Sequence, residues 1–426
     1  MKTRIKDVLA LLPDGTVQQA DIAIEGQYIK AVGNVPPDFH QDRTIDGSGK
    51  LAAPGFVNAH THASMSLLRS YADDMALMDW LQEKIWPVED AMTEDDLYWG
   101  AMLAAAEMIR SGTTAFADMY GPYMDAVAKA AIESGLRGIL ARGIVAVAPG
   151  AYEKLEGSAN FYKTYHGAAD GRITVMLSPH SLYTCPPEFI EKLADKAKLL
   201  GAEVHIHMSE TRGEVEDCLK NYGKRPFAHV EATGLFENGT LAAHCVWLDE
   251  EEIGIIKRHG IRVVHNPGSN LKLASGIAPV PRLLSEGICV GLGTDGASSN
   301  NNLDMLEEVR FAALLGKVES MDPRAIPAFQ AIRMGTELGA RAVGLKDTGR
   351  LESGSKADIV LYSMEGPEWH PRHNLVSILA YSANSGAVDT VLVDGQVLME
   401  KKQLLTIDEE KVFFEAERCV KRLMRK

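Results

Sequence analysis

The sequence predicts an α/β fold: a (β/α)8 barrel of the TIM type at residues 55–345, with a small composite β-sandwich domain built from residues 1–54 and 346–426. Three observations support this prediction. Short apolar runs alternate with helical segments through the middle of the chain, strand-and-turn patterns occupy both ends, and chemically active side chains stand where the central runs finish.

The two ends of the chain share a hairpin pattern. Gly26 and Gly395 each stand between two β-prone runs, and glycine can adopt the positive φ that a tight hairpin turn needs. The expected strands of this domain are residues 21–24, 28–32, 357–362, 390–393 and 397–400. We expect them to pair in one small domain, followed by an amphipathic helix at residues 409–425.

The middle of the chain contains eight apolar, β-prone runs. They are residues 56–60, 113–118, 137–144, 173–180, 202–208, 240–246, 262–267 and 288–295. Helical patterns separate them, as at 95–110, which ends at the C-cap signal Ser111-Gly112, and at 187–200 and 249–259. Buried runs that alternate with helices are typical of parallel β/α units, and eight such units predict a barrel.

Composition limits the partners and the cellular location that we expect for this protein. The 426 residues carry 44 Lys and Arg against 58 Asp and Glu, a formal charge of -14, which disfavours nucleic acid as a partner. No apolar run approaches the roughly 18 residues of a membrane span. The five scattered cysteines fit a reducing, cytoplasmic location. Barrels of this kind often associate, so a homo-oligomer is compatible with the sequence.

The residues at the carboxyl ends of the eight runs suggest a shared site. In chain order these residues are His60, Asp118, Arg142, His180, His207, His244, His265 and Asp295. The carboxyl ends of barrel strands meet on one face. Core packing gives no reason to place five histidines there, so a common functional site is the better interpretation.

Three of these residues and a neighbour form a candidate metal site. His60 and His62 have i, i+2 spacing, which places both imidazoles on one side of an extended chain. His207 and Asp295 stand at the ends of the fifth and eighth runs. Three imidazoles and one carboxylate, with an open position for water, are typical of a catalytic Zn²⁺ or Fe²⁺ site.

Longer stretches of sequence around these positions resemble the motifs of a known protein family. They are Pro54 to His62, His207-Met208-Ser209-Glu210-Thr211, Ala243-His244-Cys245, His265 to Asn270, and Gly293-Thr294-Asp295-Gly296. Together they resemble the amidohydrolase superfamily and, within it, the 5'-methylthioadenosine/S-adenosylhomocysteine deaminase family over essentially the whole chain. The fourth run ends in Leu177-Ser178-Pro179-His180 without the lysine that bridges two metals in some members, so one divalent ion is expected.

The resemblance implies a reaction. A metal-activated water, with Zn²⁺ preferred and Fe²⁺ as the alternative, would deaminate 5'-methylthioadenosine, S-adenosylhomocysteine, adenosine or 5'-deoxyadenosine to the inosine analogue and ammonia. Glu210 would deliver the proton to the ring nitrogen and contact the substrate. Asp295 would ligate the metal, contact the substrate and accept a proton from water, and His244 would hydrogen-bond the attacking hydroxyl.

The resemblance also implies substrate contacts. Glu89, in Trp86-Pro87-Val88-Glu89, matches the glutamate that holds the ribose hydroxyls, while Arg142 and His180 match positions that contact the nucleoside. Two alternatives stay open. One is an amino- or chlorohydrolase of a free heterocyclic base (guanine, pterin or triazine), and the other is a non-catalytic assembly protein that has kept the barrel.

Overall fold

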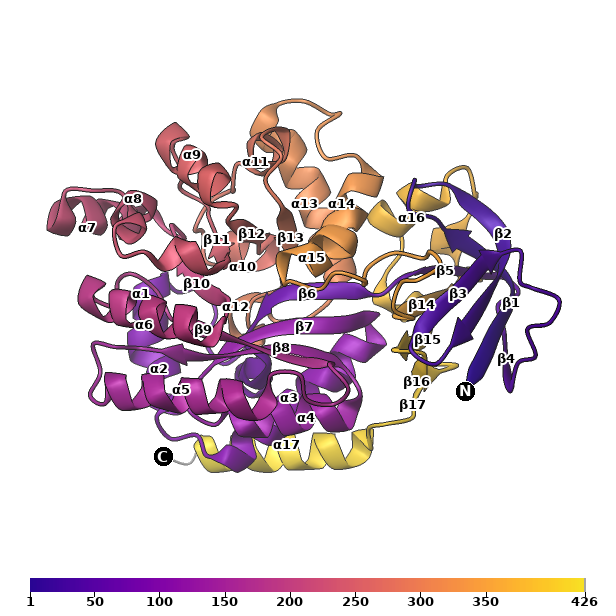
Figure 1. Cartoon of the computed structure of the whole chain (residues 1–426), viewed down its shortest axis with the longest axis horizontal. Helices are drawn as coiled ribbons and strands as arrows, with labels where there is room; N and C mark the ends of the chain where they lie inside the picture. The colour runs from indigo at the N-terminus through magenta and orange to yellow at the C-terminus, as the bar shows by residue number, and fades with distance from the viewer. Residues whose placement is uncertain (425–426) are drawn as a thin grey trace.

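The computed structural model describes residues 1–424, in which a parallel barrel lies beside a smaller mixed sheet (Figure 1). The barrel strands follow one another in chain order: β6 (Phe56–Thr61), β7 (Thr113–Tyr120), β8 (Arg137–Ile144), β9 (Ile173–Pro179), β10 (Val204–Met208), β11 (Thr240–His244), β12 (Arg262–His265) and β13 (Val290–Leu292). Just beyond β13, Asp295 N donates a hydrogen bond to His60 O at 3.0 Å, which joins the last strand to the first. The eight predicted runs are confirmed, with ends that differ by a few residues.

Helices cover the outside of the barrel and, in the case of α10 (Pro267–Lys272), its mouth. They are α3 (Glu94–Arg110), α4 (Met124–Ser134), α5 (Ala151–Tyr165), α6 (Pro187–Leu200), α7 (Arg212–Tyr222), α8 (Pro226–Glu231), α9 (Glu250–His259), α10, α11 (Val280–Ser285), α13 (Met305–Ser320), α14 (Ala328–Gly335) and α15 (Glu337–Ala342). Capping boxes begin α3 at Thr93 and α9 at Asp249. The helices predicted at 95–110, 187–200 and 249–259 are confirmed to within one residue.

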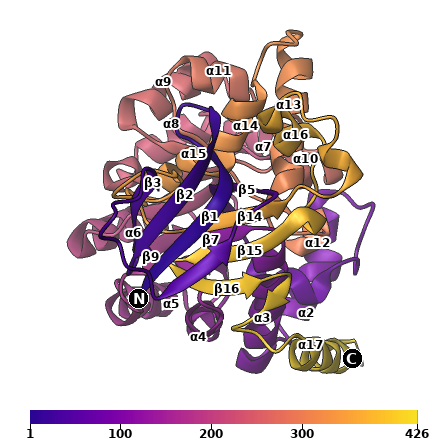
Figure 2. The same ribbon diagram turned by 90° about the vertical axis from the view of Figure 1, so that its right-hand side faces the viewer.

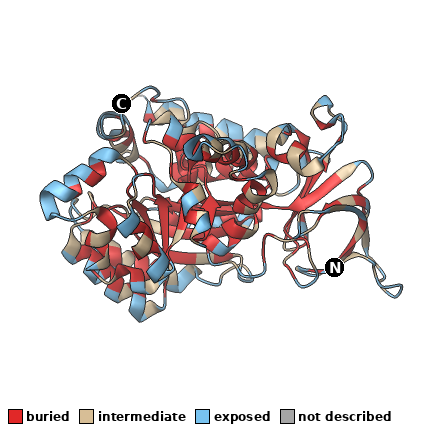
Figure 3. Cartoon of the chain, turned by 90° about the horizontal axis from the view of Figure 1, so that it is seen from above, coloured by how far each residue is buried: buried red, intermediate tan, exposed pale blue. Residues whose placement is uncertain are grey.

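Shorter helices lie in the loops that follow β6 and β13. They are α1 (Leu77–Asp79), α2 (Trp86–Glu89) and α12 (Ala297–Asn300), with a 3₁₀ turn η1 (Ala63–Leu68) and a π-helix η2 (Trp80–Ile85). Burial is concentrated in the barrel strands, while the outer helices expose one face (Figure 3). Within residues 1–424, no helix has both the length and the apolar character needed to cross a bilayer.

Strands from both ends of the chain form the mixed sheet, as predicted (Figure 2). Its order is β17-β16-β15-β14-β5-β1-β2-β3, with β4 paired to β1. The bounds are β1 (Lys2–Leu11), β2 (Val17–Glu25), β3 (Tyr28–Gly33), β4 (Arg43–Asp46), β5 (Lys50–Pro54), β14 (Ile359–Ser363), β15 (Val388–Val393), β16 (Gln396–Glu400) and β17 (Gln403–Leu404). The division of the chain at residues 54/55 and 345/346 stays a prediction.

This sheet curls around its own apolar core. Ile5, Ile22, Ile359 and Leu392 come from four different strands and are fully buried in that core. A Cβ added at Gly395 would lie only 2.3 Å from Gly26 O, so the β15–β16 turn packs directly on the β2–β3 turn. The predicted sandwich is therefore built from one continuous hydrogen-bonded sheet.

Two helices follow β14 in the chain and pack on the barrel. Helix α16 (Leu375–Tyr381) contacts α13 and α14, and α17 (Glu409–Leu423) contacts α3. The buried face of α17 consists of Val412, Ala416, Cys419 and Leu423. The predicted C-terminal helix is confirmed as far as Leu423, and Arg425 lies outside the described residues.

A buried ion cluster joins the barrel to the sheet. Arg137, at the start of β8, places Nη2 3.1 Å from Asp358 Oδ2 and 2.7 Å from Asp394 Oδ1, and its side chain is 3 % exposed. Arg137→Met is expected to lower the free energy of unfolding by about 3–5 kcal/mol, because it leaves the buried Asp358 without a cation and leaves Asp394 with Lys356 alone, at 3.4 Å. Urea denaturation of the variant measures this loss.

The control for Arg137 is an exposed ion pair. Arg258 lies 2.7 Å from Glu231 with a side chain that is 59 % exposed, and Arg258→Met is expected to cost less than about 1 kcal/mol. Equal losses in the two variants would contradict a special role for the buried cluster.

Candidate metal centre and active site

Three histidines converge at the mouth of the barrel. Strand β6 carries His60, and His62 follows it with the expected i, i+2 spacing, so that the ring centroids lie 5.0 Å apart. His207, near the end of β10, has its ring centroid 4.8 Å from that of His60 and 5.4 Å from that of His62. One nitrogen from each of the three rings lies within 4.8 Å of the other two.

Asp295 completes the cluster from the loop after β13. Its Oδ1 lies 3.1 Å from His62 Nε2 and 3.4 Å from His60 Nε2. The other oxygen, Oδ2, accepts hydrogen bonds from Ser269 Oγ at 2.6 Å and Ser299 Oγ at 2.8 Å. One carboxylate oxygen is therefore held by hydroxyl groups while the other faces the imidazoles.

The Nδ1 atoms of these three histidines are engaged away from the cluster. Their partners are His205 Nε2 at 2.9 Å for His60, His180 O at 2.7 Å for His207, and Met119 O for His62. A carbonyl oxygen can only accept, so Nδ1 of His62 and His207 carries a proton, and Nε2 is the nitrogen of each ring that remains to bind a cation. Such contacts fix the tautomer and ring orientation of metal-binding histidines.

The protonation states also fit a cation. Among residues 1–424, the buried His60 Nε2 and Asp295 Oδ1 make no hydrogen bond. Burial lowers the pKa of His60 to about 4 and holds the pKa of His207 well below its usual range, so both rings are neutral near pH 7. Burial opposes protonation of His62, but Asp295 raises the pKa of His62 to about 9. A cation would therefore displace a proton there.

Glu210 and His244 adjoin this cluster. Glu210 lies between β10 and α7, and its Oε2 is 3.8 Å from His244 Nε2. His244, the last residue of β11, has Nδ1 2.9 Å from Asn270 Oδ1, which turns Nε2 toward Glu210. Burial raises the pKa of Glu210, which favours a proton on this carboxyl group.

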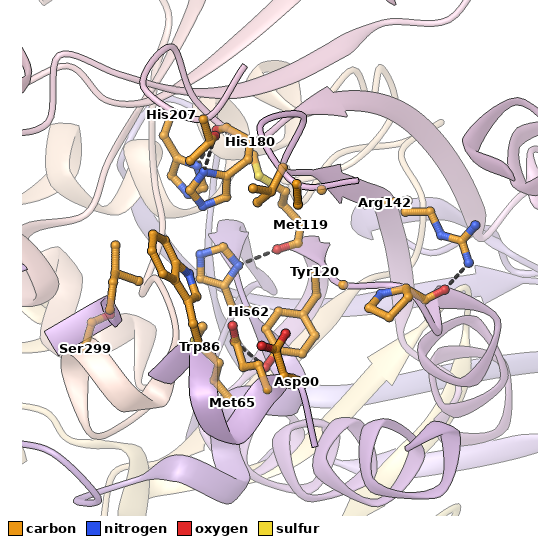
Figure 4. A pocket seen from close by; sticks show the side chains of 18 of the residues that line it. His62, Met65, Trp86, Asp90, Met119, Tyr120, Arg142, His180, His207 and Ser299 are labelled. Atoms are coloured by element: carbon orange, nitrogen blue, oxygen red, sulfur yellow. Dashed lines mark hydrogen bonds between the residues drawn. The ribbon is translucent and has the colours of Figure 1, made fainter. Parts of the chain in front are cut away.

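A cavity of about 840 Å³ opens over the cluster (Figure 4). Its lining includes His62, Glu89, Arg142, His180, His207, Glu210, His244 and Asp295. Glu89, at the end of α2, accepts a hydrogen bond from Tyr120 Oη at 2.6 Å. Burial raises the pKa of Glu89, although the Tyr120 hydrogen bond opposes the rise.

The two remaining predicted residues differ in their placement. The His180 ring centroid lies 4.7 Å from that of His207, with Nδ1 3.1 Å from Ser181 Oγ and 3.0 Å from Thr184 Oγ1. The Arg142 guanidinium donates to Pro122 O and stands apart from the histidines (Figure 4). Their contacts with substrate stay predictions.

Sequence reasoning missed the residues that hold the site in place. These are His205, Ser269, Asn270, Ser299 and Tyr120, which contact His60, Asp295, His244, Asp295 and Glu89 respectively. His205-Ile206-His207 repeats the i, i+2 spacing of the first histidine pair, and that repeat could have identified His205. Ser269 and Asn270 lie in the stretch His265 to Asn270 that carries the family resemblance, although it gave them no role, whereas Ser299 and Tyr120 carry no comparable local signal.

The parallel barrel and the cluster of three histidines and one aspartate at its mouth define a metal-dependent hydrolase. The sequence model of the Amidohydrolase family matches residues 51–398, and the chain belongs to this family. A curated relative from Pelotomaculum thermopropionicum, called 5-methylthioadenosine/S-adenosylhomocysteine deaminase, is 53% identical over 415 residues, which cover 97% of this chain and 96% of the relative.

Solved structures share the fold and contain zinc. An adenosine deaminase from Xanthomonas campestris with bound zinc superposes with a TM-score of 0.95 at 33% identity, over 100% of this chain and 99% of that one. Atrazine chlorohydrolase from Arthrobacter aurescens, complexed with zinc, gives a TM-score of 0.91 at 26% identity, over 98% and 100% of the two chains. The histidine and aspartate cluster fits a divalent metal ion.

Proposed function

We propose that the protein hydrolytically deaminates adenine nucleosides, among them 5'-methylthioadenosine, S-adenosylhomocysteine, adenosine and 5'-deoxyadenosine, to the inosine analogue and ammonia. One observation carries this proposal: the buried Glu210 carboxyl faces the same cavity as the histidine and aspartate cluster. The name of the relative that is 53% identical supports the choice of substrate class.

His60, His62, His207 and Asp295 would hold the metal, for which we propose Zn²⁺. Bound there, the ion would lower the pKa of water toward neutrality and so supply a nucleophile near pH 7. Zinc accepts imidazole and carboxylate ligands together, and zinc in the related adenosine deaminase structure supports the choice. Metal analysis of the purified protein tests it, and bound iron in place of zinc would favour the Fe²⁺ alternative.

The residues around the cluster would move the protons. Glu210 would donate its proton to the ring nitrogen next to the carbon under attack, since its raised pKa favours the protonated form. Asp295 would accept a proton from the water. His244 would hold the attacking oxygen in line through Nε2, because its other nitrogen is engaged with Asn270. The departing amine would take up the proton held by Asp295 and leave as ammonia, while the hydroxyl proton would return to Glu210 as the carbonyl forms.

The decisive experiment is an ammonia-release screen with metal-replete protein. Adenine nucleosides are expected to react faster than free guanine, pterin or triazine. A preference for free bases would favour the amino- or chlorohydrolase alternative. A protein that shows no activity and binds no metal would favour the alternative of a non-catalytic assembly protein. A cytoplasmic location, the lack of a nucleic-acid partner and association into a homo-oligomer stay predictions.

Glu89 is expected to select nucleosides by binding the ribose hydroxyls. A carboxylate can accept hydrogen bonds from two adjacent hydroxyl groups, and Tyr120 holds this carboxylate on the cavity wall. Glu89→Ala should raise KM for nucleosides by the equivalent of about 1–3 kcal/mol, with a small effect on kcat. Steady-state kinetics with adenosine measure the change.

Glu83→Ala is the matched control for Glu89. Glu83 lies in η2, a few residues before Glu89, and its side chain is exposed to solvent. Its replacement should leave KM unchanged. If Glu89→Ala also leaves KM unchanged, Glu89 has no part in nucleoside recognition.

A further inference from the structure

Glu214 is a buried carboxylate to which the proposed reaction gives no role. It is the third residue of α7, and only 9 % of its surface is exposed. Its side chain turns back past the start of the helix. Oε1 accepts a hydrogen bond from Ser209 N at 3.0 Å, and Oε2 accepts one from Glu210 N at 2.8 Å. Both oxygens therefore bind the backbone that carries the proposed proton donor.

These contacts are not those of an ordinary helix cap. In a capping box, the side chain of the third helical residue binds the backbone N–H of the N-cap residue, as Glu252 does with Asp249 at the start of α9. In α7 the N-cap residue is Thr211, whose Oγ1 accepts a hydrogen bond from Glu214 N at 3.1 Å. The Glu214 carboxylate passes over Thr211 and binds the two residues before it.

The backbone held by Glu214 has an uncommon conformation. Ser209 has φ +50°, in the left-handed region that residues with a side chain rarely adopt. Its carbonyl oxygen accepts hydrogen bonds from Val246 N and Trp247 N, both at 3.0 Å. Residues 209–210 are thus clamped between α7 on one side and the segment after β11 on the other.

The same clamp connects Glu210 to His244. Cys245, which directly follows His244, donates its backbone N–H to Met208 O at 2.9 Å. The distance of 3.8 Å between Glu210 Oε2 and His244 Nε2 therefore depends on how two short segments pack against each other. The Glu214 carboxylate supplies two of the hydrogen bonds that fix the Glu210 side of this arrangement.

We propose that Glu214 is a positioning residue for the reaction. By holding the N–H groups of Ser209 and Glu210, it sets the place of the Glu210 carboxyl group over the cavity. We rest this role on the proposed function, in which Glu210 moves the proton. Misplacement of a reacting group by about 1 Å can cost on the order of 10²-fold in rate.

Glu214→Gln tests this role because it keeps the size of the side chain but turns one acceptor into an NH₂ group that faces a backbone N–H. We expect kcat for adenosine to fall about 10- to 100-fold, while KM stays within about twofold and the metal content is unchanged. Glu214→Asp, which keeps the charge but draws the oxygens back, should also lower kcat at constant KM. Glu216→Gln is the matched control, because Glu216 is an exposed residue of the same helix that pairs with Arg212.

A double variant separates positioning from general stability. In a Glu210→Gln background, Glu214→Gln should cause no further loss of kcat. The amide at position 210 has no acidic proton to deliver, so its exact position no longer matters to the rate. An unchanged kcat in both Glu214 variants, an equal loss in the Glu210→Gln background, or a fall in metal content would overturn the positioning role. If Glu210→Gln alone keeps full activity, the proposed function of Glu210 fails instead.

Discussion

His207→Ala is expected to abolish ammonia release from adenosine and to lower the metal content of the purified protein. His207 offers a neutral imidazole whose Nδ1 is fixed by His180 O at 2.7 Å, and its ring meets those of His60 and His62. Without it, the cluster loses one of the three nitrogen ligands that we propose. We expect a loss of more than about a thousandfold, since the reaction depends on water made acidic by the metal.

Metal analysis by mass spectrometry, together with the ammonia assay, measures both effects of His207→Ala. His229→Ala is the matched control, because His229 lies on α8 and stacks on Tyr222 outside the barrel mouth. It should retain full activity and metal. Activity retained by His207→Ala would remove His207 from the ligand set.

Glu210→Gln is expected to lower kcat by about 10²- to 10⁴-fold, the usual contribution of a positioned proton donor. Glutamine has nearly the same shape but cannot deliver a proton. Because Glu210 is not part of the proposed ligand set, the metal content should stay at the wild-type level. This combination distinguishes Glu210→Gln from His207→Ala, in which activity and metal are lost together.

Pre-steady-state and steady-state kinetics with adenosine measure the loss in Glu210→Gln. Glu216→Gln on the exposed face of α7 should behave like the wild type. A Glu210→Gln enzyme with near-normal kcat would show that another group protonates the ring.

The barrel was predictable because its strands are buried on both faces and read as continuous apolar runs between helices. The convergence of the strand-end residues followed from the parallel arrangement alone, and the 3.1 Å between His62 and Asp295 bears that expectation out. The hairpin turns at Gly26 and Gly395 were also predictable, because each glycine stands between two β-prone runs. Both glycines have the positive φ values that such turns need.

What sequence reasoning missed depends on contacts between distant segments. The hydrogen bond from Ser269 to Asp295 and that between His60 and His205 join segments far apart in the chain, and no local pattern predicts that these residues contact each other. The packing of α17 on α3 could not be predicted either, because an amphipathic pattern identifies a buried face but not the element that covers it. The clamp around Glu210 needs φ values that are uncommon for Ser209 and could not be read from the chain.

The central position of β5 in the mixed sheet has a consequence for biosynthesis. This strand pairs with β1 on one side and with β14 on the other, and it runs through Gly55 straight into β6, which carries His60. On the ribosome, its β14 edge stays open until about three hundred more residues have been translated. We therefore expect the mixed sheet to close late in folding, once β14 has been translated.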